Sequence, residues 1–396
     1  MEATYFYDKE HTNFNVPTKA EYELNKLLNN ENRTFLDVIL SVPGSDIISG
    51  NVSKCYNIIN NPSYSAGKIA VSLSGGSDSD VVLDIVARCD KDHKAYYYFV
   101  NTGLESKYTK EHLDYLELKY QIEIDRFNAK TPIPLAVRKE GIPFLSKQVS
   151  EFLMRLERYG FEYDDSDDLK ALCEKYCEKA SDELADKIRN HEASIGRYKL
   201  VEGDYYTGCV SALEWWCNKK GRTGEKSMFN ISRNPYLKEF LIKEHGLPFK
   251  VANKCCKLSK KDTIKGALDI IKPELSIQGV RKAEGGARAA AYKNCFNDPS
   301  SHNYAEYRPV FWFLDADKKE YEEFCGIKHS RLYDYLKRTG CSGCPFGQDI
   351  DAELNCFKEI EPNMYKAMQF VFGPAYAFTR KYKEFQKEMK AKEKEL

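Results

Sequence analysis

Short apolar runs that alternate with helical patterns constrain the fold of this chain most strongly. The run KIAVSLS (residues 68–74) ends at a glycine pair, and a helix-periodic segment with one apolar side follows it. A second run, AYYYFVNTG (95–103), precedes the helical pattern KYTKEHLDYLELKY, after which QIEIDRFNA predicts a third strand. The sheet is expected to resume at LSIQGVR (275–281) and again at RPVFWFLDA (308–316). This alternation predicts an α/β fold with a mostly parallel, twisted sheet and helices on both faces.

The remaining segments set the predicted domain organisation. Residues 1–66 predict a helical accessory region, with helices over TKAEYELNKLLN and near RTFLDVILSV and a polar loop after them. Residues 67–350 are expected to form the main domain. Within it, a charged and periodic stretch at about 150–200, nearly free of proline and glycine, predicts a helical insertion. Residues 351–396 are expected to form a helical C-terminal tail that is mostly solvated.

Charge and cysteine content narrow the classes of function. Lys plus Arg and Asp plus Glu each number 60, so no overall field draws the chain to nucleic acid or membranes, and any anion site must be local. The N-terminus lacks the pattern of a signal peptide, and no apolar run approaches the length of a membrane span. We therefore expect a cytoplasmic protein. In a reducing compartment, the 13 cysteines favour metal binding, catalysis or core packing over disulfides.

The turn after the first strand has the residues of a phosphate site. Paired glycines let the backbone approach a ligand, hydroxyls donate hydrogen bonds, and the amides at a helix N-terminus supply partial positive charge. Asp78 is suited either to cap the helix or to help hold Mg²⁺ beside a diphosphate. Taken alone, such a turn is also an ordinary strand-to-helix connection. The candidate nucleotide-binding residues are Ser74, Gly75, Gly76, Ser77, Asp78 and Ser79.

The order SGGxDS after an apolar strand resembles the PP-loop of the ATP pyrophosphatase superfamily. Members of that superfamily bind an adenine nucleotide and split it at the α-phosphate, or act on an adenylylated substrate. The loop is not a Walker loop, because no Gly-Lys-Ser/Thr follows. The resemblance implies an adenine nucleotide alpha hydrolase-like fold and ATP or a related adenylyl nucleotide as the ligand.

Two downstream segments are similar to the phosphoadenylyl sulfate (PAPS) reductase family. NTGLESKYTKEHLDYL (101–116) is similar to that family's DTGLE segment, with Asn101 where the family usually has aspartate. GVRKAEGGARAA resembles its second signature, which implies that Gly279 and Arg281 contact nucleotide and that Arg281 and Arg288 stabilise charge. Each arginine is able to hold phosphate or sulfate oxygens bidentately. The alternative is that both are solvated loop residues.

The stretch NKCCKLSKK (253–261) sets two thiols side by side, and a disulfide between neighbours is strained. A Cys-x-x-Cys pair occurs later, in TGCSGCPFG. This pattern resembles the [4Fe-4S] ligand set of adenylyl sulfate reductases and of related sulfur-transfer enzymes, including those of DNA phosphorothioation. The resemblance implies a [4Fe-4S] cluster held by Cys255, Cys256, Cys341 and Cys344.

A cluster suits adjacent cysteines better than zinc does. Neighbouring side chains of an extended backbone point apart, so they reach two irons of a cubane more easily than one tetrahedral ion. Nearby lysines favour thiolate and offset the negative charge of a cluster, or they simply begin a solvated helix. A purely structural zinc site remains an alternative. These lysines are Lys254, Lys257, Lys260 and Lys261.

The chain departs from sulfonucleotide reductases in two places. Those enzymes have a catalytic cysteine near the C-terminus, whereas no cysteine follows Cys356 here, and the loop SGGSDS is closer to that of ATP-using members. We therefore expect an enzyme that activates an acceptor by adenylylation for sulfur transfer. The nucleophile is unassigned, although a thiol elsewhere, such as Cys295, is available.

Two other functions remain open from the sequence. One is a phosphoadenylyl or adenylyl sulfate reductase proper. The other is a non-catalytic, nucleotide-binding subunit of a nucleic-acid-modifying or defence complex, which the N-terminal extension and the charged insertion favour. The acceptor itself is open to either a nucleic acid or a protein, and no membrane partner is expected.

Overall fold

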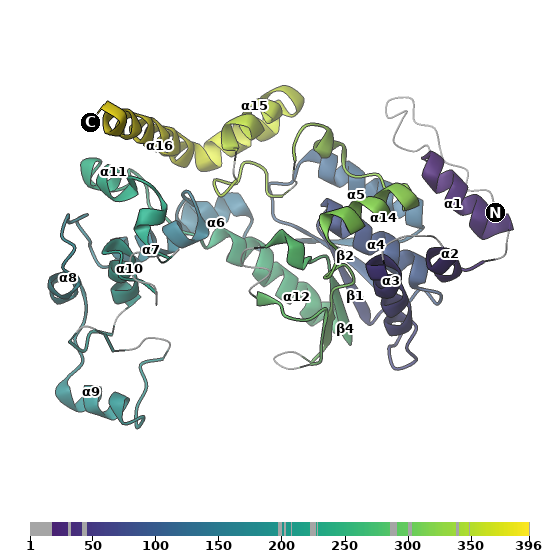
Figure 1. Cartoon of the computed structure of the whole chain (residues 1–396), viewed down its shortest axis with the longest axis horizontal. Helices are drawn as coiled ribbons and strands as arrows, with labels where there is room; N and C mark the ends of the chain where they lie inside the picture. Colours follow the sequence, from purple (N-terminus) through teal and green to yellow (C-terminus); the bar gives the residue numbers. More distant parts are fainter. Residues whose placement is uncertain are drawn as a thin grey trace. The chain divides into compact units, whose positions relative to one another are not determined.

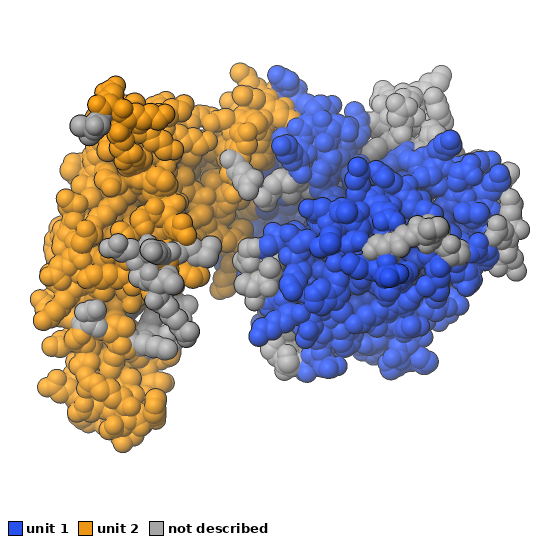
Figure 2. Space-filling view, viewed as in Figure 1, with its two compact units in different colours: residues 1–132, 258–342, 359–361 blue, residues 133–257, 343–358, 362–396 orange. Residues whose placement is uncertain are grey.

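The computed structural model describes most of the chain, and its residues fall into two compact units (Figure 2). Unit 1 comprises residues 1–132, 258–342 and 359–361, and unit 2 comprises residues 133–257, 343–358 and 362–396. The domain boundaries expected from the sequence stay a prediction. The described residues are 18–30, 33–41, 46–196, 200–201, 203–206, 208–221, 227, 229–285, 291–299, 303–337, 340–347 and 349–395.

Unit 1 contains a six-stranded sheet in the order β3-β2-β1-β4-β6-β5. All neighbouring strands pair in parallel except β5 and β6, which are antiparallel. The α/β fold expected from the alternating pattern is therefore confirmed. The strands are β1 (Ile69–Leu73), β2 (Ala95–Asn101), β3 (Ile124–Asn128), β4 (Leu275–Gln278), β5 (Phe296–Asn297) and β6 (Ala305–Tyr307).

Helices cover both faces of the sheet because the strands are apolar on both sides (Figure 1). Ile69, Val71 and Leu73 pack into one core with α4 (Ser77–Cys89), whereas Ala70 packs on the opposite face with α12 (Asp262–Ile271). Successive side chains of a strand point to opposite faces, which explains the division. The first face is also covered by α3 (Asp46–Ile59) and α14 (Asp315–Cys325), and α5 (Lys107–Tyr120) connects β2 to β3.

In the described part of residues 18–68, three helices precede the first strand. The two predicted ones are present as α1 (Lys19–Asn30) and α2 (Phe35–Ser41). The polar loop expected after them is wrong over 46–59, where the chain forms α3. Its buried residues, Ile48, Val52, Cys55 and Ile59, recur at helical spacing, but serine, asparagine and lysine between them mask the pattern.

The strand predicted at RPVFWFLDA (308–316) is also wrong. Turns occupy 309–312, and α14 begins at Asp315; the strand next to β4 is instead β6, just upstream. Phe311 and Phe313 are fully buried, so the apolar run reflects core packing of a turn rather than a strand.

Unit 2 is built mainly of helices around Trp215 and Trp216, which are both fully buried. The predicted helical insertion appears as α7, α8 and α9, and the predicted C-terminal helix as α16, whose residues from 383 onward are largely exposed. No helix within the described ranges is both long enough and apolar enough to cross a membrane. The helices are α6 (Ile133–Glu140), α7 (Lys147–Arg158), α8 (Leu169–Tyr176), α9 (Asp182–Arg189), α10 (Gly208–Trp216), α11 (Leu237–Lys243), most of α15 (Ile350–Ile360) and α16 (Pro362–Glu395).

Candidate functional site: the loop after the first strand

The serine and glycine turn links the end of β1 to the first turn of α4. Gly75 adopts φ +67°, and a Cβ there would lie 2.8 Å from Thr109 Cγ2, so both conformation and space require glycine. The Ser74 N–H donates to Ser79 Oγ at 3.0 Å, which closes the turn onto the helix. The helix begins without a side-chain cap, and the Ser77 N–H donates to Tyr333 Oη at 2.8 Å.

The turn lies at the switch point of the sheet. From β1 the chain passes to β2 and β3 on one side, and β4 lies on the other side of β1, with Ser72 paired to Gln278. Ligands of open α/β sheets bind where the strand order reverses, outside the carboxyl ends of the strands. Gly279 follows β4 there, and a Cβ on it would lie 3.3 Å from the Asp78 backbone. The two loops therefore meet closely because residue 279 is glycine.

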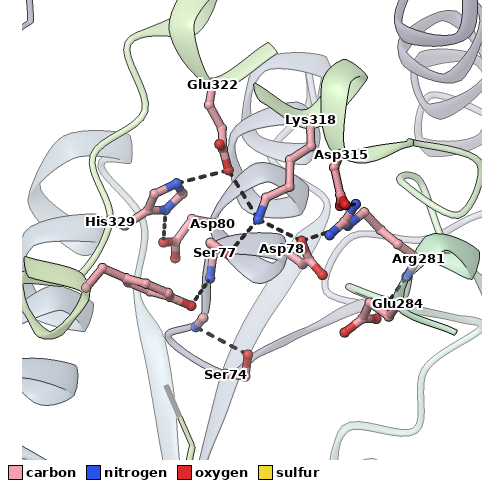
Figure 3. A network of polar contacts seen from close by, with 12 residues as sticks. Ser74, Ser77, Asp78, Asp80, Arg281, Glu284, Asp315, Lys318, Glu322 and His329 are labelled. Atoms are coloured by element: carbon pink, nitrogen blue, oxygen red, sulfur yellow. Dashed lines mark hydrogen bonds and ion pairs between the residues drawn. The ribbon is translucent and has the colours of Figure 1, made fainter. Parts of the chain in front are cut away.

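Arg281 lies at this junction. Its Nε is 2.9 Å from Asp78 Oδ1 and its Nη1 is 2.8 Å from Asp315 Oδ1, while its backbone N–H donates to Glu284 (Figure 3). The guanidinium is only 9% exposed. Burial lowers the pKa of Arg281, but Asp315 and Asp78 outweigh burial and raise it. Arg288, the second predicted arginine, lies outside the described residues.

Lys318 is a basic residue of this site that the sequence reasoning missed. It projects from α14, and its Nζ donates to Ser77 Oγ at 2.6 Å and lies 2.9 Å from Asp78 Oδ1 (Figure 3). Burial lowers the pKa of Lys318, but Asp78 outweighs burial and raises it, so the ammonium is charged. No motif surrounds this lysine in the sequence, and only the fold brings it to the loop.

A buried carboxylate and two histidines support the first turn of α4. Asp80 is 1% exposed, with Oδ1 2.9 Å from His112 Nε2 and Oδ2 2.7 Å from His329 Nδ1. Burial raises the pKa of Asp80, but the two histidines outweigh burial and lower it. Burial lowers the pKa of His329, but hydrogen bonds to Asp80 and Glu322 outweigh burial and raise it to about 9. His329 is therefore a cation at neutral pH.

The segment after β2 contacts Cys341, the first cysteine of the predicted Cys-x-x-Cys pair. Gly103 N–H donates to Asn101 Oδ1 at 3.0 Å, so the amide shapes this turn. Thr102 Oγ1 donates to the buried Glu105 at 2.6 Å and lies 3.5 Å from Cys341 Sγ. Burial raises the pKa of Glu105, although Thr102 opposes the shift. The NTGLE segment and Cys341 are thus neighbours within unit 1.

The four predicted cluster cysteines are divided between the units. Cys255, Cys256 and Cys344 belong to unit 2, and Cys341 belongs to unit 1. Interaction with Cys256, together with burial and Cys344, raises the pKa of the Cys255 thiol, so the three thiols of unit 2 interact. Among the described residues, no three His, Cys, Asp or Glu side chains are arranged to hold a metal ion.

Two of the lysines near these cysteines interact with carboxylates. Lys254 Nζ lies 2.6 Å from Glu140 Oε2, and Lys260 acts on Glu105 by lowering its pKa. A π-helix over Cys256–Lys261 leads into α12, so these lysines also begin a helix, as the alternative reading expected. Cys295, the other thiol considered from the sequence, is buried and accepts a hydrogen bond from Lys54 at 3.0 Å.

A comparison with family models finds a match to one segment of the chain. Residues 68–159 match the phosphoadenosine phosphosulfate reductase domain. The match begins at β1 and includes the serine and glycine turn, so it confirms the resemblance recognised from the motifs over this segment, which is less than a quarter of the chain. No curated protein matches the chain.

Comparison with solved structures finds low overall similarity. The phosphoadenylyl-sulfate reductase of Candida auris is 10% identical, with a TM-score of 0.33 over 80% of this chain and 92% of that chain. The FMN adenylyltransferase of Candida glabrata, in complex with ATP, is 10% identical, with a TM-score of 0.35 over 80% and 68%. The U34-tRNA thiolase NcsA of Methanococcus maripaludis, with its [4Fe-4S] cluster, is 12% identical, with a TM-score of 0.32 over 86% and 80%.

Proposed function

We propose that this chain is an adenine-nucleotide-dependent PP-loop enzyme that adenylylates an acceptor for sulfur transfer. One observation carries the proposal: Arg281 contacts the SGGSDS turn at the switch point of a parallel sheet. The turn lies within the segment that matches the reductase domain. Amides at the start of α4, the hydroxyls of the turn and a buried guanidinium provide a site for phosphate oxygens.

In the proposed reaction, an acceptor oxygen attacks the α-phosphorus of ATP. The bond from that phosphorus to the bridging oxygen breaks, pyrophosphate leaves, and the acceptor proton passes to solvent. Negative charge grows on the departing pyrophosphate, so donors fixed in advance along the turn and at Arg281 lower the barrier. Arg288 is proposed for the same role. Asp78 is proposed to help hold Mg²⁺ once a diphosphate is bound.

Cys255, Cys256, Cys341 and Cys344 are proposed to hold a [4Fe-4S] cluster. All four donors are thiols, and Cys255 interacts electrostatically with Cys256 and with Cys344, so the donor set fits the chemistry of an iron–sulfur centre. Lysines beside the adjacent pair offset the charge of bound thiolates. When bound, the cluster would supply electrons or a binding position for sulfur. The acceptor class, nucleic acid or protein, stays open.

Nucleotide binding is the first test. Isothermal titration of the anaerobically purified full chain with ATP is expected to show binding, and Arg281→Met is expected to weaken it about tenfold or more. Lys282→Met is the matched control, because Lys282 is the next residue but stacks over the ring of Trp312. Absence of ATP binding by the wild-type chain overturns the proposal.

Metal analysis tests the cluster separately. The anaerobically purified chain is expected to be brown with four irons, and Cys255→Ser and Cys344→Ser are expected to lose the iron. Cys173→Ser is the control, because Cys173 is a packing residue of α8 in the unit 2 core. A colourless chain with a single zinc refutes the cluster and leaves a structural metal.

A sulfonucleotide reductase proper is the second candidate, and the match to the reductase domain favours it. The two candidates differ in their products. The proposed enzyme releases pyrophosphate from ATP in the presence of its acceptor, whereas a reductase releases sulfite from a sulfonucleotide with a thiol reductant. If the chain binds nucleotide but forms neither product, the result indicates a non-catalytic subunit.

A further inference from the structure

We propose that Lys318 binds a phosphate of the nucleotide at this site. While no nucleotide is bound, Asp78 takes the place of that phosphate by forming ion pairs with Lys318 and Arg281. The inference rests on the proposed function and adds a ligand from α14, outside the segment that matches the reductase domain and outside every motif.

The first argument is convergence on one atom. Lys318 Nζ and Arg281 Nε each lie 2.9 Å from the same oxygen, Asp78 Oδ1 (Figure 3). Two cations that share one carboxylate oxygen repel each other, and Arg281 does lower the pKa of Lys318. A phosphate offers several charged oxygens, so it receives both cations with less crowding than Asp78 does.

The second argument is burial. The side chains of Arg281 and Lys318 are 9% and 14% exposed, so each requires a strong partner. The other carboxylate on Arg281, Asp315, is 89% exposed, and water screens that contact. Asp78, at 16% exposure, is therefore the principal counter-charge of both cations, and whatever takes its place must also be an anion.

The third argument is orientation. Ser77 Oγ accepts a hydrogen bond from Lys318 Nζ at 2.6 Å, which directs the ammonium to the first residue of α4, where the partial positive charge of a helix N-terminus attracts anions. Glu322 Oε1 lies farther from Lys318, at 3.4 Å, and closer to His329 Nε2, at 3.0 Å. Protonated His329 thus takes up much of the Glu322 charge, and Lys318 stays directed to the turn.

Titration of variants of the full chain tests the inference. In Mg²⁺-free buffer with inorganic pyrophosphate, and separately with ATP, Lys318→Met is expected to raise Kd about tenfold or more, because a charge-assisted hydrogen bond to phosphate is lost. Lys318→Arg keeps the cation and is expected to recover most of the affinity. Lys319→Met is the matched control, since Lys319 is 76% exposed and pairs with Glu323 instead.

A labelling experiment on the wild-type chain provides a second readout if Lys318→Met fails to fold. Saturating ATP is expected to reduce acetylation of Lys318 by an amine reagent and to leave Lys319 unchanged, as measured by mass spectrometry of peptides from α14. A wild-type chain that binds neither ATP nor pyrophosphate refutes the proposed function itself. If the wild-type chain binds ATP, this inference alone is refuted by either of two results. One is that Lys318→Met binds ATP with the same affinity, and the other is that ATP leaves the labelling of Lys318 unchanged.

Discussion

Removing the His329 charge should weaken the fold below pH 9 but not above it. His329 bridges Asp80 and Glu322, and its pKa rises from 6.5 to about 9. At about 1.4 kcal/mol per pKa unit, this corresponds to about 3 kcal/mol of stability. Because the folded pKa is raised, that stability is fully present below pH 6.5 and is lost as the pH rises through 9. The side chain is only 20% exposed, so solvent screens the interaction little.

His329→Gln keeps hydrogen-bonding atoms at the position but removes the charge. Urea unfolding followed by circular dichroism should show a deficit of about 3 kcal/mol at pH 6 and a much smaller one at pH 9.5. His93→Gln, at an exposed histidine, is the control and should show no such pH dependence. The chain has seven histidines, so the resonance lost in His329→Gln assigns the imidazole for a direct titration by NMR. A deficit equal at both pH values, or a pKa at or below 6.5, refutes this reasoning.

Three further variants test the neighbouring geometry. Asp78→Asn should tighten pyrophosphate binding in Mg²⁺-free buffer about tenfold, because the internal competitor for two cations is removed. Gly279→Ala should lower the free energy of unfolding by about 1–3 kcal/mol and weaken ATP binding, since the new methyl group would crowd the Asp78 backbone at 3.3 Å. Gly343→Ala should reduce the iron content, because Gly343 has φ +69° and a Cβ there would lie 2.5 Å from Tyr376 Oη.

Matched glycines provide the controls for two of these variants. A Cβ on Gly266, within α12, meets nothing within 4 Å, so Gly266→Ala should leave ATP binding unchanged and stabilise the helix by about 0.5–1 kcal/mol. Gly340 precedes the Cys-x-x-Cys pair and is equally open, so Gly340→Ala should retain iron. Pyrophosphate affinity that falls in Asp78→Asn, or iron retained in Gly343→Ala, contradicts the corresponding argument.

The sequence predicted β3, β2, β1 and β4 but failed at the edge formed by β6 and β5. β1 and β2 are buried on both faces, so each appears as a continuous apolar run that is easy to recognise. β5 and β6 have two and three residues, too few for any period to appear. Residues 308–316 were wrongly predicted as a strand because they are rich in apolar residues, several of which are buried between β6 and α14.

The sequence predicted those residues of the candidate site that belong to a local motif. The serine and glycine turn is local, and glycine is required at 75 by its backbone conformation, so sequence alone indicated it. Lys318 and His329 reach the loop through the packing of α14 and the segment after it, and neither has a distinctive sequence context. Arg281 was indicated by its motif, but its pairing with Asp78 required the fold.

Zero net charge and a phosphate site are compatible because this chain balances charge locally. Two cations buried beside the loop without a partner would destabilise the fold, and Asp78 reduces that cost by pairing with both. The same contact lowers affinity for an anion, because a phosphate must displace the carboxylate before it binds Lys318 and Arg281. Asp78 therefore stabilises the nucleotide-free fold and at the same time lowers the affinity for nucleotide. A divalent cation that draws Asp78 away would relieve this opposition, so the affinity gained on adding Mg²⁺ should be smaller in Asp78→Asn than in the wild-type chain.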